Sequence, residues 1–327
     1  MSVTIRQIAE QAGISKATVS RVLNGLPVKM ETEHKIRQVM ERLNYRPNRF
    51  ARSLTSRKTG LIGLLTPDYQ QPYTSFLVGG IEEEAKRLGR IPTLSLSDQA
   101  DGKDLVHSLI HPRLVDGLIL IVPSPEMDPA IKFLLKEEVP FVVVSERRYE
   151  DQATCLVIDN LGGAREATRY LLQKGHKRVG VITGRMDLTD AVDRLEGYRQ
   201  ALAEASIPFR EELVQKGDFL FESGRQAVEK FLALPEPPTA IFACNDMMAM
   251  GALRALWDRK RTDEIKVMGF DDLPLASYIY PSLTTVSYDL NELGKLAVSK
   301  LVGLVDGRET QRSLVQLKTR IVVRESA

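Results

Sequence analysis

The N-terminal end of the chain carries the pattern of two short helices joined by a tight turn. Thr4 and Gln7 have the spacing of a capping box, in which each side chain bonds the other residue's backbone amide. Apolar residues recur at helical spacing over 5–12, and Gly13 then suits the left-handed conformation that closes a helix. Ser15 can cap a second helix. In such a helix-turn-helix, the second helix enters the major groove of DNA.

An ordinary helical hairpin at the edge of a larger domain would show the same pattern, but the distribution of charge favours DNA binding. Residues 1–60 hold twelve Lys and Arg against four Glu and no Asp, whereas the other 267 residues hold 33 basic and 39 acidic side chains. The overall charge of +2 is therefore the sum of a strongly basic N-terminal segment, the basic head, and an acidic remainder of the chain. A basic head suits a polyanion, which it binds in a salt-dependent way.

A third amphipathic helix is expected over 30–44, and a short polar segment follows it at 48–56. One or two helical turns with almost no apolar face are marginal in water. Leu54 and the Arg residues of this segment favour a helix that orders on DNA, with Leu54 as an apolar wedge in the minor groove. A plain linker is the alternative that composition alone favours.

From residue 60 onward, β-rich runs alternate with helical patterns. Strands are expected at 61–65, 93–96, 117–122, 141–144, 179–183, 213–217, 240–243 and 265–269. Helices are expected near 75–89, 101–111, 128–138, 163–174, 192–206, 222–234 and 246–258, with a further one at about 289–306. This alternation predicts two parallel, doubly wound α/β units. Ligands bind to such sheets in a crevice at the carboxyl ends of the strands.

Several function classes are disfavoured by what the sequence lacks. It has no apolar run of membrane-span length, no signal peptide, no Gly-rich phosphate loop and no nucleophile elbow. Its four His are scattered, and Cys155 and Cys244 lie in apolar surroundings as core thiols of a reducing compartment. We therefore expect a cytoplasmic protein with no metal, no cofactor, no membrane partner and no catalytic residue. A sugar or nucleoside enzyme fused to a DNA-binding domain is the rival class.

Short motifs at characteristic spacing extend this picture along the whole chain. They comprise residues 5–21, Asn-Tyr-Arg-Pro-Asn at 44–48, Ala-Arg-Ser-Leu at 51–54, Val-Asp-Gly at 115–117, Ile-Asp-Asn at 158–160, Gly-His-Lys-Arg at 175–178, Arg-Leu-Glu-Gly-Tyr at 194–198, 245–251, Gly-Phe-Asp-Asp at 269–272 and 281–286. Together they resemble the lactose/galactose-repressor (LacI-type) family of bacterial transcription regulators. The regions around 159–198 and 217–254 are most similar to its cytidine and purine repressor branch.

The resemblance implies an all-α helix-turn-helix domain, a hinge, and a two-lobe core of periplasmic-binding-protein type. The domain boundaries would be 1–47 for the DNA-binding domain, 48–59 for the hinge helix or linker, 60–159 plus 288–318 for the N-terminal lobe, and 160–287 plus 319–327 for the C-terminal lobe. Crossings between the lobes are expected near 159–161, 287–290 and 317–320. The family pattern further implies a homodimer on a near-palindromic operator of double-stranded DNA.

Residues on the outward face of the second helix are expected to select bases, and their neighbours to hold phosphates. The base-selecting set is Lys16, Ala17 and Arg21. The phosphate set is Thr4, Ser15, Thr18, Ser20, Asn24, Tyr45 and Asn48, and Ala51 and Leu54 complete the expected DNA-binding residues.

Family positions also imply a ligand site at the strand ends. Its expected residues are Asp68, Tyr73, Ser145, Asp190, Arg194, Phe219, Asn245 and Asp271. Aromatic rings would stack on a ligand ring, and carboxylates would accept bonds from hydroxyl groups. A structural role fits Arg194 equally well, in which its side chain links the start of a helix to the neighbouring loop. Tyr73 and Phe219 also fit as plain core residues.

Some positions depart from the sugar-binding pattern of the family. Ser145 and Glu146 precede two Arg where an Asp, Asn or Arg pair is common, and Thr74 replaces an aromatic residue. Lys29 stands where a helix-capping Ser is usual, and the connection 259–264 is short. Three acids against one or two Arg favour a neutral sugar or nucleoside as effector. A purine base acting as co-repressor is the next choice.

Overall fold

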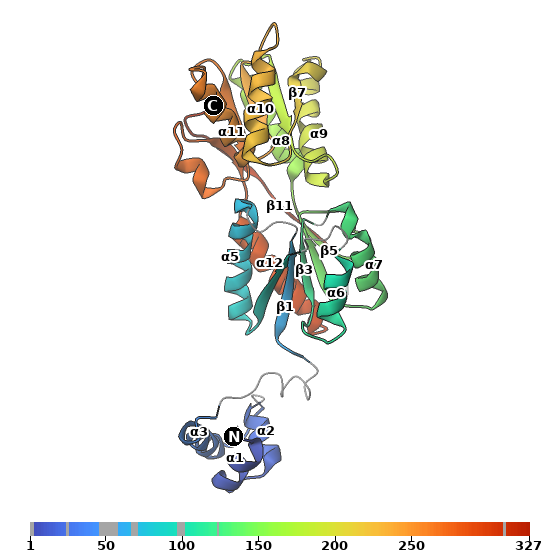
Figure 1. The fold of residues 1–327 in the computed structure, drawn as a ribbon, viewed down its shortest axis with the longest axis vertical. Coiled ribbons are helices and arrows are strands. Elements are labelled where there is room, and N and C mark those ends of the chain that lie inside the picture. Colours follow the sequence, from blue (N-terminus) through green and yellow to red (C-terminus); the bar gives the residue numbers. More distant parts are fainter. Residues whose placement is uncertain are drawn as a thin grey trace. The chain divides into compact units, whose positions relative to one another are not determined.

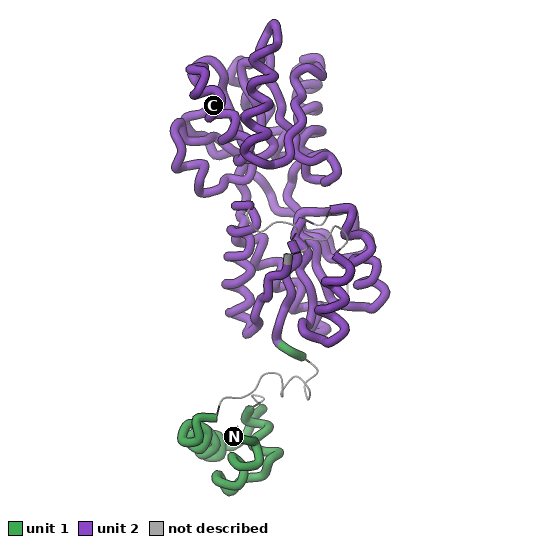
Figure 2. Tube along the Cα trace, viewed as in Figure 1, with its two compact units in different colours: residues 1–59 green, residues 60–327 purple. Residues whose placement is uncertain are grey.

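The computed structural model describes residues 3–23, 26–45, 58–66, 71–96, 102–122, 124–309 and 312–327. The chain divides into two compact units, Met1–Thr59 and Gly60–Ala327 (Figures 1 and 2). The segment 48–56, with its expected wedge Leu54, lies outside the described residues. No helix within the described ranges has the length and apolar character needed to cross a bilayer.

The N-terminal unit contains three helices, α1 (Ile5–Ala12), α2 (Lys16–Leu23) and α3 (Met30–Arg42). The predicted capping box is confirmed, because the Thr4 amide donates to Gln7 Oε1 at 2.8 Å and the Gln7 amide to Thr4 Oγ1 at 3.4 Å. Gly13 closes α1 with φ of 61°. The Thr18 amide donates to Ser15 Oγ at 3.1 Å, so Ser15 caps α2 as expected.

One apolar cluster holds these helices together. Ile8 of α1, Val19 of α2 and Ile36 of α3 are fully buried in it. Lys29 occupies the N-cap position of α3 and makes no side-chain capping bond there. This is expected, because a capping side chain accepts a hydrogen bond from a backbone amide and the lysine side chain has no acceptor. The first turn of α3 gains instead from two acidic side chains, Glu31 and Glu33, near its positive dipole end.

The first lobe of the larger unit is built on a fully parallel sheet with the order β11-β5-β4-β3-β1-β2. Its strands are β1 (Leu61–Thr66), β2 (Ile91–Leu96), β3 (Leu118–Ile121), β4 (Phe141–Val144), β5 (Thr154–Ile158) and β11 (Leu314–Leu317). Its helices are α5 (Pro72–Arg87), α6 (Lys103–Ile110), α7 (Asp128–Lys136, after the 3-10 turn Pro125–Met127) and α12 (Leu290–Val305). In Figure 1, α5 and α12 cover one face of the sheet, and α6 and α7 cover the other.

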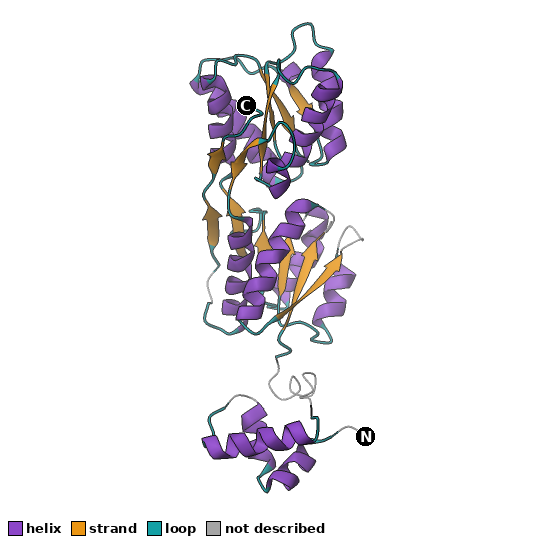
Figure 3. Ribbon diagram, turned by 90° about the vertical axis from the view of Figure 1, so that its left-hand side faces the viewer, coloured by secondary structure: helices purple, strands orange, loops and turns teal. Residues whose placement is uncertain are grey.

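The second lobe repeats this plan with the strand order β12-β10-β9-β8-β6-β7. Its strands are β6 (Val179–Thr183), β7 (Val214–Lys216), β8 (Ala240–Ala243), β9 (Lys266–Phe270), β10 (Thr284–Ser287) and β12 (Arg320–Val322). Its helices are α8 (Asn160–Gln173), α9 (Thr189–Glu204), α10 (Phe221–Leu232) and α11 (Asp246–Asp258), with 3-10 turns at Glu211–Leu213 and Pro274–Ser277. Only β12 runs antiparallel, beside β10, among the described pairs. Helices flank both sheets (Figure 3), so the predicted fold class is confirmed.

The chain passes between the two sheets at three points: from β5 into α8, from β10 into α12, and from β11 into β12. Four strands at these points, β5, β10, β11 and β12, were not predicted from the sequence. Each has three to five residues, and two of them lie at sheet edges. The two edge strands pair with segments far along the chain, Leu314 of β11 with Cys155 and Arg320 of β12 with Ser287, so no local pattern predicts them.

Two helices of the first lobe approach each other closely at glycine. A Cβ atom at Gly80 of α5 would lie 2.1 Å from the carbonyl oxygen of Asn291 in α12. Gly294 of α12 makes the reciprocal approach, with a Cβ only 2.4 Å from the carbonyl oxygen of Leu77. The packing of α5 on α12 therefore depends on the absence of side chains at these positions.

Gly80→Ala should accordingly destabilise the fold by about 1–3 kcal/mol, because the helices must separate to admit the methyl group. Gly79→Ala is the matched control, since a Cβ there meets no atom within 4 Å. Alanine at this helical position should stabilise by about 0.5–1 kcal/mol. Thermal melts of the two variants should shift in opposite directions, and equal shifts would contradict the close packing.

Candidate functional site

The exposed face of α2 presents the three side chains predicted to select bases. Lys16, Ala17 and Arg21 are all exposed, whereas Val19 and Val22 on the opposite side are buried. The Arg21 guanidinium donates to the carbonyl oxygen of Pro27 at 3.0 Å. This one bond engages a single nitrogen, so Arg21 keeps donors for other acceptors.

The residues predicted to hold phosphates differ in their exposure. Thr4 and Ser15 are exposed at the N-terminal ends of α1 and α2, and the Thr18 hydroxyl lies 2.9 Å from Ser15 Oγ. Ser20 is half-buried, and the half-buried Tyr45 packs against the apolar cluster of the three helices. Four residues of the predicted interface lie outside the described residues, namely Asn24, Asn48, Ala51 and Leu54.

A cavity of about 380 Å³ lies in the larger unit, where strand ends of both lobes contribute side chains. The first lobe contributes Thr66, Gln71, Tyr73, Thr74 and Val122, and the second contributes Arg185, Leu188, Asp190, Arg194, Asp218, Phe219, Leu220, Asn245 and Asp271. The volume falls in the range of small-molecule sites, and the position is the one where doubly wound sheets bind ligands. Six of the eight predicted ligand residues meet here. Asp68 lies outside the described residues.

Arg194 is the centre of the polar wall of this cavity, and it is only 3% exposed. Its Nε donates to Asn160 Oδ1 at 2.8 Å, and its Nη1 donates to the carbonyl oxygen of Cys244. Its Nη2 lies 3.4 Å from Asp271 Oδ1 and 3.9 Å from Asp190 Oδ2. Both sequence interpretations of Arg194 thus describe the same side chain, which ties elements together and lines the cavity.

The two carboxyl groups beside Arg194 have perturbed acidities. Burial raises the pKa of Asp190 to about 7 and that of Asp271 to about 6, although the Arg194 charge works in the opposite direction for both. For Asp271, a hydrogen bond from Tyr288 also opposes the rise. Both groups therefore titrate close to neutral pH, which is unusual for aspartate.

Four of the ten described non-glycine residues with positive φ lie in or beside the cavity wall. Val122, Ser145, Phe219 and Asp271 follow β3, β4, β7 and β9, and their φ angles are 47°, 59°, 71° and 114°. Positive φ is uncommon outside glycine, and for a β-branched residue such as Val122 it is a true outlier. Such conformations persist only where the surroundings enforce them, and they concentrate at functional sites.

Three predicted residues also serve as supports. Ser145 is absent from the cavity lining and instead hydrogen-bonds the hydroxyl of Tyr73, which does line it. Asn245 caps α11 by accepting from the Met248 amide at 2.9 Å, and it donates to the Phe219 carbonyl at 2.9 Å. The Phe219 ring covers Gly184, where a Cβ atom would lie 1.9 Å from it. Tyr73 and Phe219 both contact the hydrophobic core and the cavity.

Two further residues of this network escaped the sequence analysis. Asn160 accepts from Arg194 and donates to Asp190 Oδ1 at 2.7 Å, so it orients both groups from the first crossing. Tyr288 lies on the second crossing and donates to Asp271 Oδ1 at 3.0 Å. Asn160 is the last residue of the quoted motif at 158–160, and Tyr288 lies two residues after the quoted motif at 281–286. Their roles depend on contacts between distant segments.

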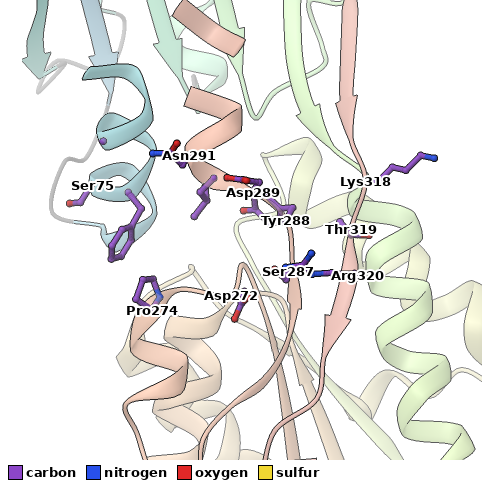
Figure 4. A pocket seen from close by; sticks show the side chains of 13 residues that line it. Ser75, Asp272, Pro274, Ser287, Tyr288, Asp289, Asn291, Lys318, Thr319 and Arg320 are labelled. Atoms are coloured by element: carbon purple, nitrogen blue, oxygen red, sulfur yellow. The ribbon is translucent and has the colours of Figure 1, made fainter. Parts of the chain in front are cut away.

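A second hollow, of about 690 Å³, lies beside the crossings (Figure 4). Ser75 and Phe76 of α5 line one side, and Asp272 with Pro274 lines another. Its remaining wall consists of 287–291 and 318–320, the second and third crossings. Tyr288 belongs to this wall, so its ring lies between the hollow and the cavity-lining Asp271.

The chain belongs to the LacI family of bacterial transcriptional regulators. Residues 4–48 match the family model described as bacterial regulatory proteins, lacI family, and residues 168–327 match the periplasmic binding protein-like domain. The chain is 35% identical to catabolite control protein A of Priestia megaterium over 100% of its own length and 99% of that protein. It is 30% identical to the HTH-type transcriptional repressor PurR of Histophilus somni, over 99% and 98% of the two chains.

Solved structures agree with this assignment. A complex of the transcriptional regulator CelR with cellobiose is 31% identical and superposes with a TM-score of 0.78 over 99% of this chain and 100% of that one. The lac repressor dimer bound to operator and the anti-inducer ONPF is 30% identical, with a TM-score of 0.86 over 100% and 99%. The family predicted from the sequence is confirmed. The protein is a ligand-responsive DNA-binding regulator, and its relatives are named repressors and regulators rather than enzymes.

The raised pKa of Asp190 predicts how the stability of the protein depends on pH. The folded chain keeps this proton up to about pH 7, whereas the unfolded chain releases it near the ordinary value of 3.8. Unfolding therefore releases a proton between these values, and the free energy of unfolding falls as the pH rises through this window. Asp190→Asn removes the titration, so its melting temperature should fall less steeply than that of the wild type from about pH 4 to about pH 7.

Asp187→Asn is the matched control for this measurement. A hydrogen bond from Arg185 lowers the pKa of Asp187 below its ordinary value, so this group stays ionised throughout the window. Its variant should retain the wild-type slope. An Asp190→Asn slope equal to that of the wild type would show that Asp190 does not titrate as described.

Proposed function

We propose that this regulator binds a near-palindromic operator as a homodimer and is switched by a neutral, hydroxyl-rich molecule, a sugar or a nucleoside, in the cavity. The observation that carries the proposal is the pairing of the charged groups in the cavity lining. Arg194 faces two carboxylates, and Arg185 is held by Asp187 at 2.5 Å. A multiply charged phosphate would have to break these pairs, whereas a hydroxyl group can add to them.

The remaining lining groups support the same ligand class. Ionised or protonated, Asp190 and Asp271 both accept hydrogen bonds from hydroxyl donors. Phe219 and Tyr73 offer aromatic surface on which the apolar face of a sugar ring or a base can lie. Among the similar structures, CelR is described in a complex with cellobiose, and a LacI-family regulator of Enterococcus faecium, 26% identical, with bound ribose.

The DNA-binding arrangement follows from the size of the N-terminal unit. One helix-turn-helix offers a small interface, so specific binding generally uses two heads on two half-sites. The similar lac repressor structure is described as a dimer bound to operator. We infer that Lys16, Ala17 and Arg21 read base edges in each half-site, and that the protein acts in the cytoplasm, where the DNA lies.

The ligand proposal is tested by a thermal-shift screen of the full-length chain. The screen has four arms. They are neutral mono- and disaccharides (including D-ribose and cellobiose), nucleosides, purine bases, and sugar phosphates. A molecule that binds only the folded state raises the melting temperature by mass action, so a neutral sugar or nucleoside should do so. Stabilisation by purine bases alone would favour the co-repressor alternative, and stabilisation by sugar phosphates alone would contradict the proposal.

Phe219→Ala locates the bound molecule. It removes the ring from the cavity wall and should abolish the shift that the stabilising compound produces. Phe209→Ala is the matched control, because this half-exposed ring packs on Tyr198 and Arg199 away from the cavity. A shift that survives in Phe219→Ala would place the ligand elsewhere.

Arg21→Ala tests the reading of bases by α2. Loss of a side chain that bonds a base edge should weaken operator binding by about 1–3 kcal/mol and relax sequence preference. Arg37→Ala removes an equal charge from the exposed face of α3, where the side chain pairs with Glu33, and should spare sequence preference. Fluorescence-anisotropy titrations on operator and random duplexes measure both effects. Equal weakening on the two duplexes by Arg21→Ala would make Arg21 a backbone contact.

A further inference from the structure

Tyr288 occupies the point where the second crossing leaves the sheet of the second lobe. It follows β10 directly and precedes Asp289, the N-cap of α12. Its side chain is 7% exposed, its ring lies 6.1 Å from that of Phe270, and its hydroxyl donates to Asp271 Oδ1 at 3.0 Å. Figure 4 shows it between Ser287 and Asp289 in the wall of the hollow beside the crossings.

The carboxylate of Asp271 is held from one side only. Arg194 Nη2 and the Tyr288 hydroxyl both approach the same oxygen, Oδ1, at 3.4 Å and 3.0 Å. This arrangement leaves Oδ2 for a molecule in the cavity that Asp271 lines. The backbone of Asp271 is itself strained, with φ of 114°, so the surrounding structure must enforce this conformation.

The same tyrosine belongs to a segment that connects the lobes. Val286 pairs with Phe270 in the sheet of the second lobe, while α12 begins at Leu290 and packs on α5 in the first lobe. One hydrogen bond therefore joins Asp271 to a crossing segment. Asp271 itself lies at the end of β9, in the second lobe.

We propose that Tyr288 is a positioning residue of the cavity, whose hydroxyl orients Asp271 toward the ligand and ties this carboxylate to the second crossing. The proposal deepens the proposed function, on which its ligand-binding part rests. Tyr288 need not touch the ligand. It acts through Asp271, and the bond gives the crossing a direct response to occupancy of the cavity.

The hydroxyl also favours the ionised form of Asp271. The charged and titratable groups that face this carboxyl are Arg194 and Asp190 from α9, Cys244 after β8, Asp246 from α11, Tyr73 from α5 and Tyr288 from the crossing. Burial raises the pKa of Asp271 to about 6 while Arg194 and the Tyr288 hydroxyl oppose the rise. Loss of the hydroxyl therefore raises this pKa further, whereas a merely structural role would leave it unchanged.

The decisive variant is Tyr288→Phe, which keeps the ring and removes the hydroxyl. Tyr198→Phe is its matched control, because that buried hydroxyl donates to the Val179 carbonyl at 2.7 Å and does not face Asp271. Both variants are melted without ligand from about pH 5 to about pH 8. The stability difference from the wild type should grow with pH for Tyr288→Phe, since the folded state then holds its proton to higher pH, and should stay constant for Tyr198→Phe.

A second arm measures binding of D-ribose and cellobiose to the full-length proteins by calorimetry. For whichever sugar binds the wild type, Tyr288→Phe should weaken affinity about tenfold, as expected when a charged group loses a hydrogen bond, and Tyr198→Phe should not. A constant stability difference in the first arm overturns the inference whatever the ligand is. Unchanged sugar affinity in Tyr288→Phe overturns it while leaving the proposed function intact. If neither sugar binds, the thermal-shift screen decides the ligand class of the proposed function, and the first arm still decides the role of Tyr288.

Discussion

The buried charge of Arg194 is the interaction on which the rest of the cavity depends. Removing a guanidinium from water is expensive unless its donors are satisfied and its charge is matched. Here Asn160, the Cys244 carbonyl, Asp190 and Asp271 share that task, and the Phe270 ring lies 3.8 Å below the guanidinium. Asp190 lies on the helix of Arg194 itself, whereas Asn160 begins α8, Cys244 follows β8, and Phe270 and Asp271 lie at the end of β9. This one side chain therefore ties α9 to the start of α8 and to the ends of β8 and β9.

The topology of the sheets makes such a cluster possible. In a parallel sheet all strands end at the same edge, so loops that are distant in sequence converge there. The three crossings then bring the corresponding edges of the two sheets to one cavity, with Asn160 on the first crossing and Tyr288 on the second. The left-handed residues after β3, β4, β7 and β9 turn the chain sharply at this edge. Each such conformation costs free energy of folding, and the surrounding structure keeps it in place, as is typical of functional sites.

Local sequence patterns predicted the parts of the protein that local interactions determine. The capping box of Thr4 and the left-handed Gly13 depend on neighbours within four residues, so the helix-turn-helix was evident before the structure. Hydrophobic runs likewise predicted the central strands. The family resemblance, together with positions after strands, indicated Asp190, Phe219 and Asp271 as ligand-site residues. The supporting roles of Asn160 and Tyr288 could not be predicted, because their partners lie 30, 34 and 17 residues away. The strand β11 was missed for the same reason, because it pairs with β5, about half the chain earlier.

The central claim is that occupancy of the cavity changes the affinity of the N-terminal unit for DNA. The most direct measurement is an anisotropy titration of the full-length chain onto a duplex selected by it from a random library, with and without the compound that stabilises the wild type. A ligand acts only through its different affinities for the two arrangements of the protein, which typically gives a shift of about 5- to 150-fold. The account predicts a shift of this size. Superimposable curves at a concentration that saturates the cavity would contradict it.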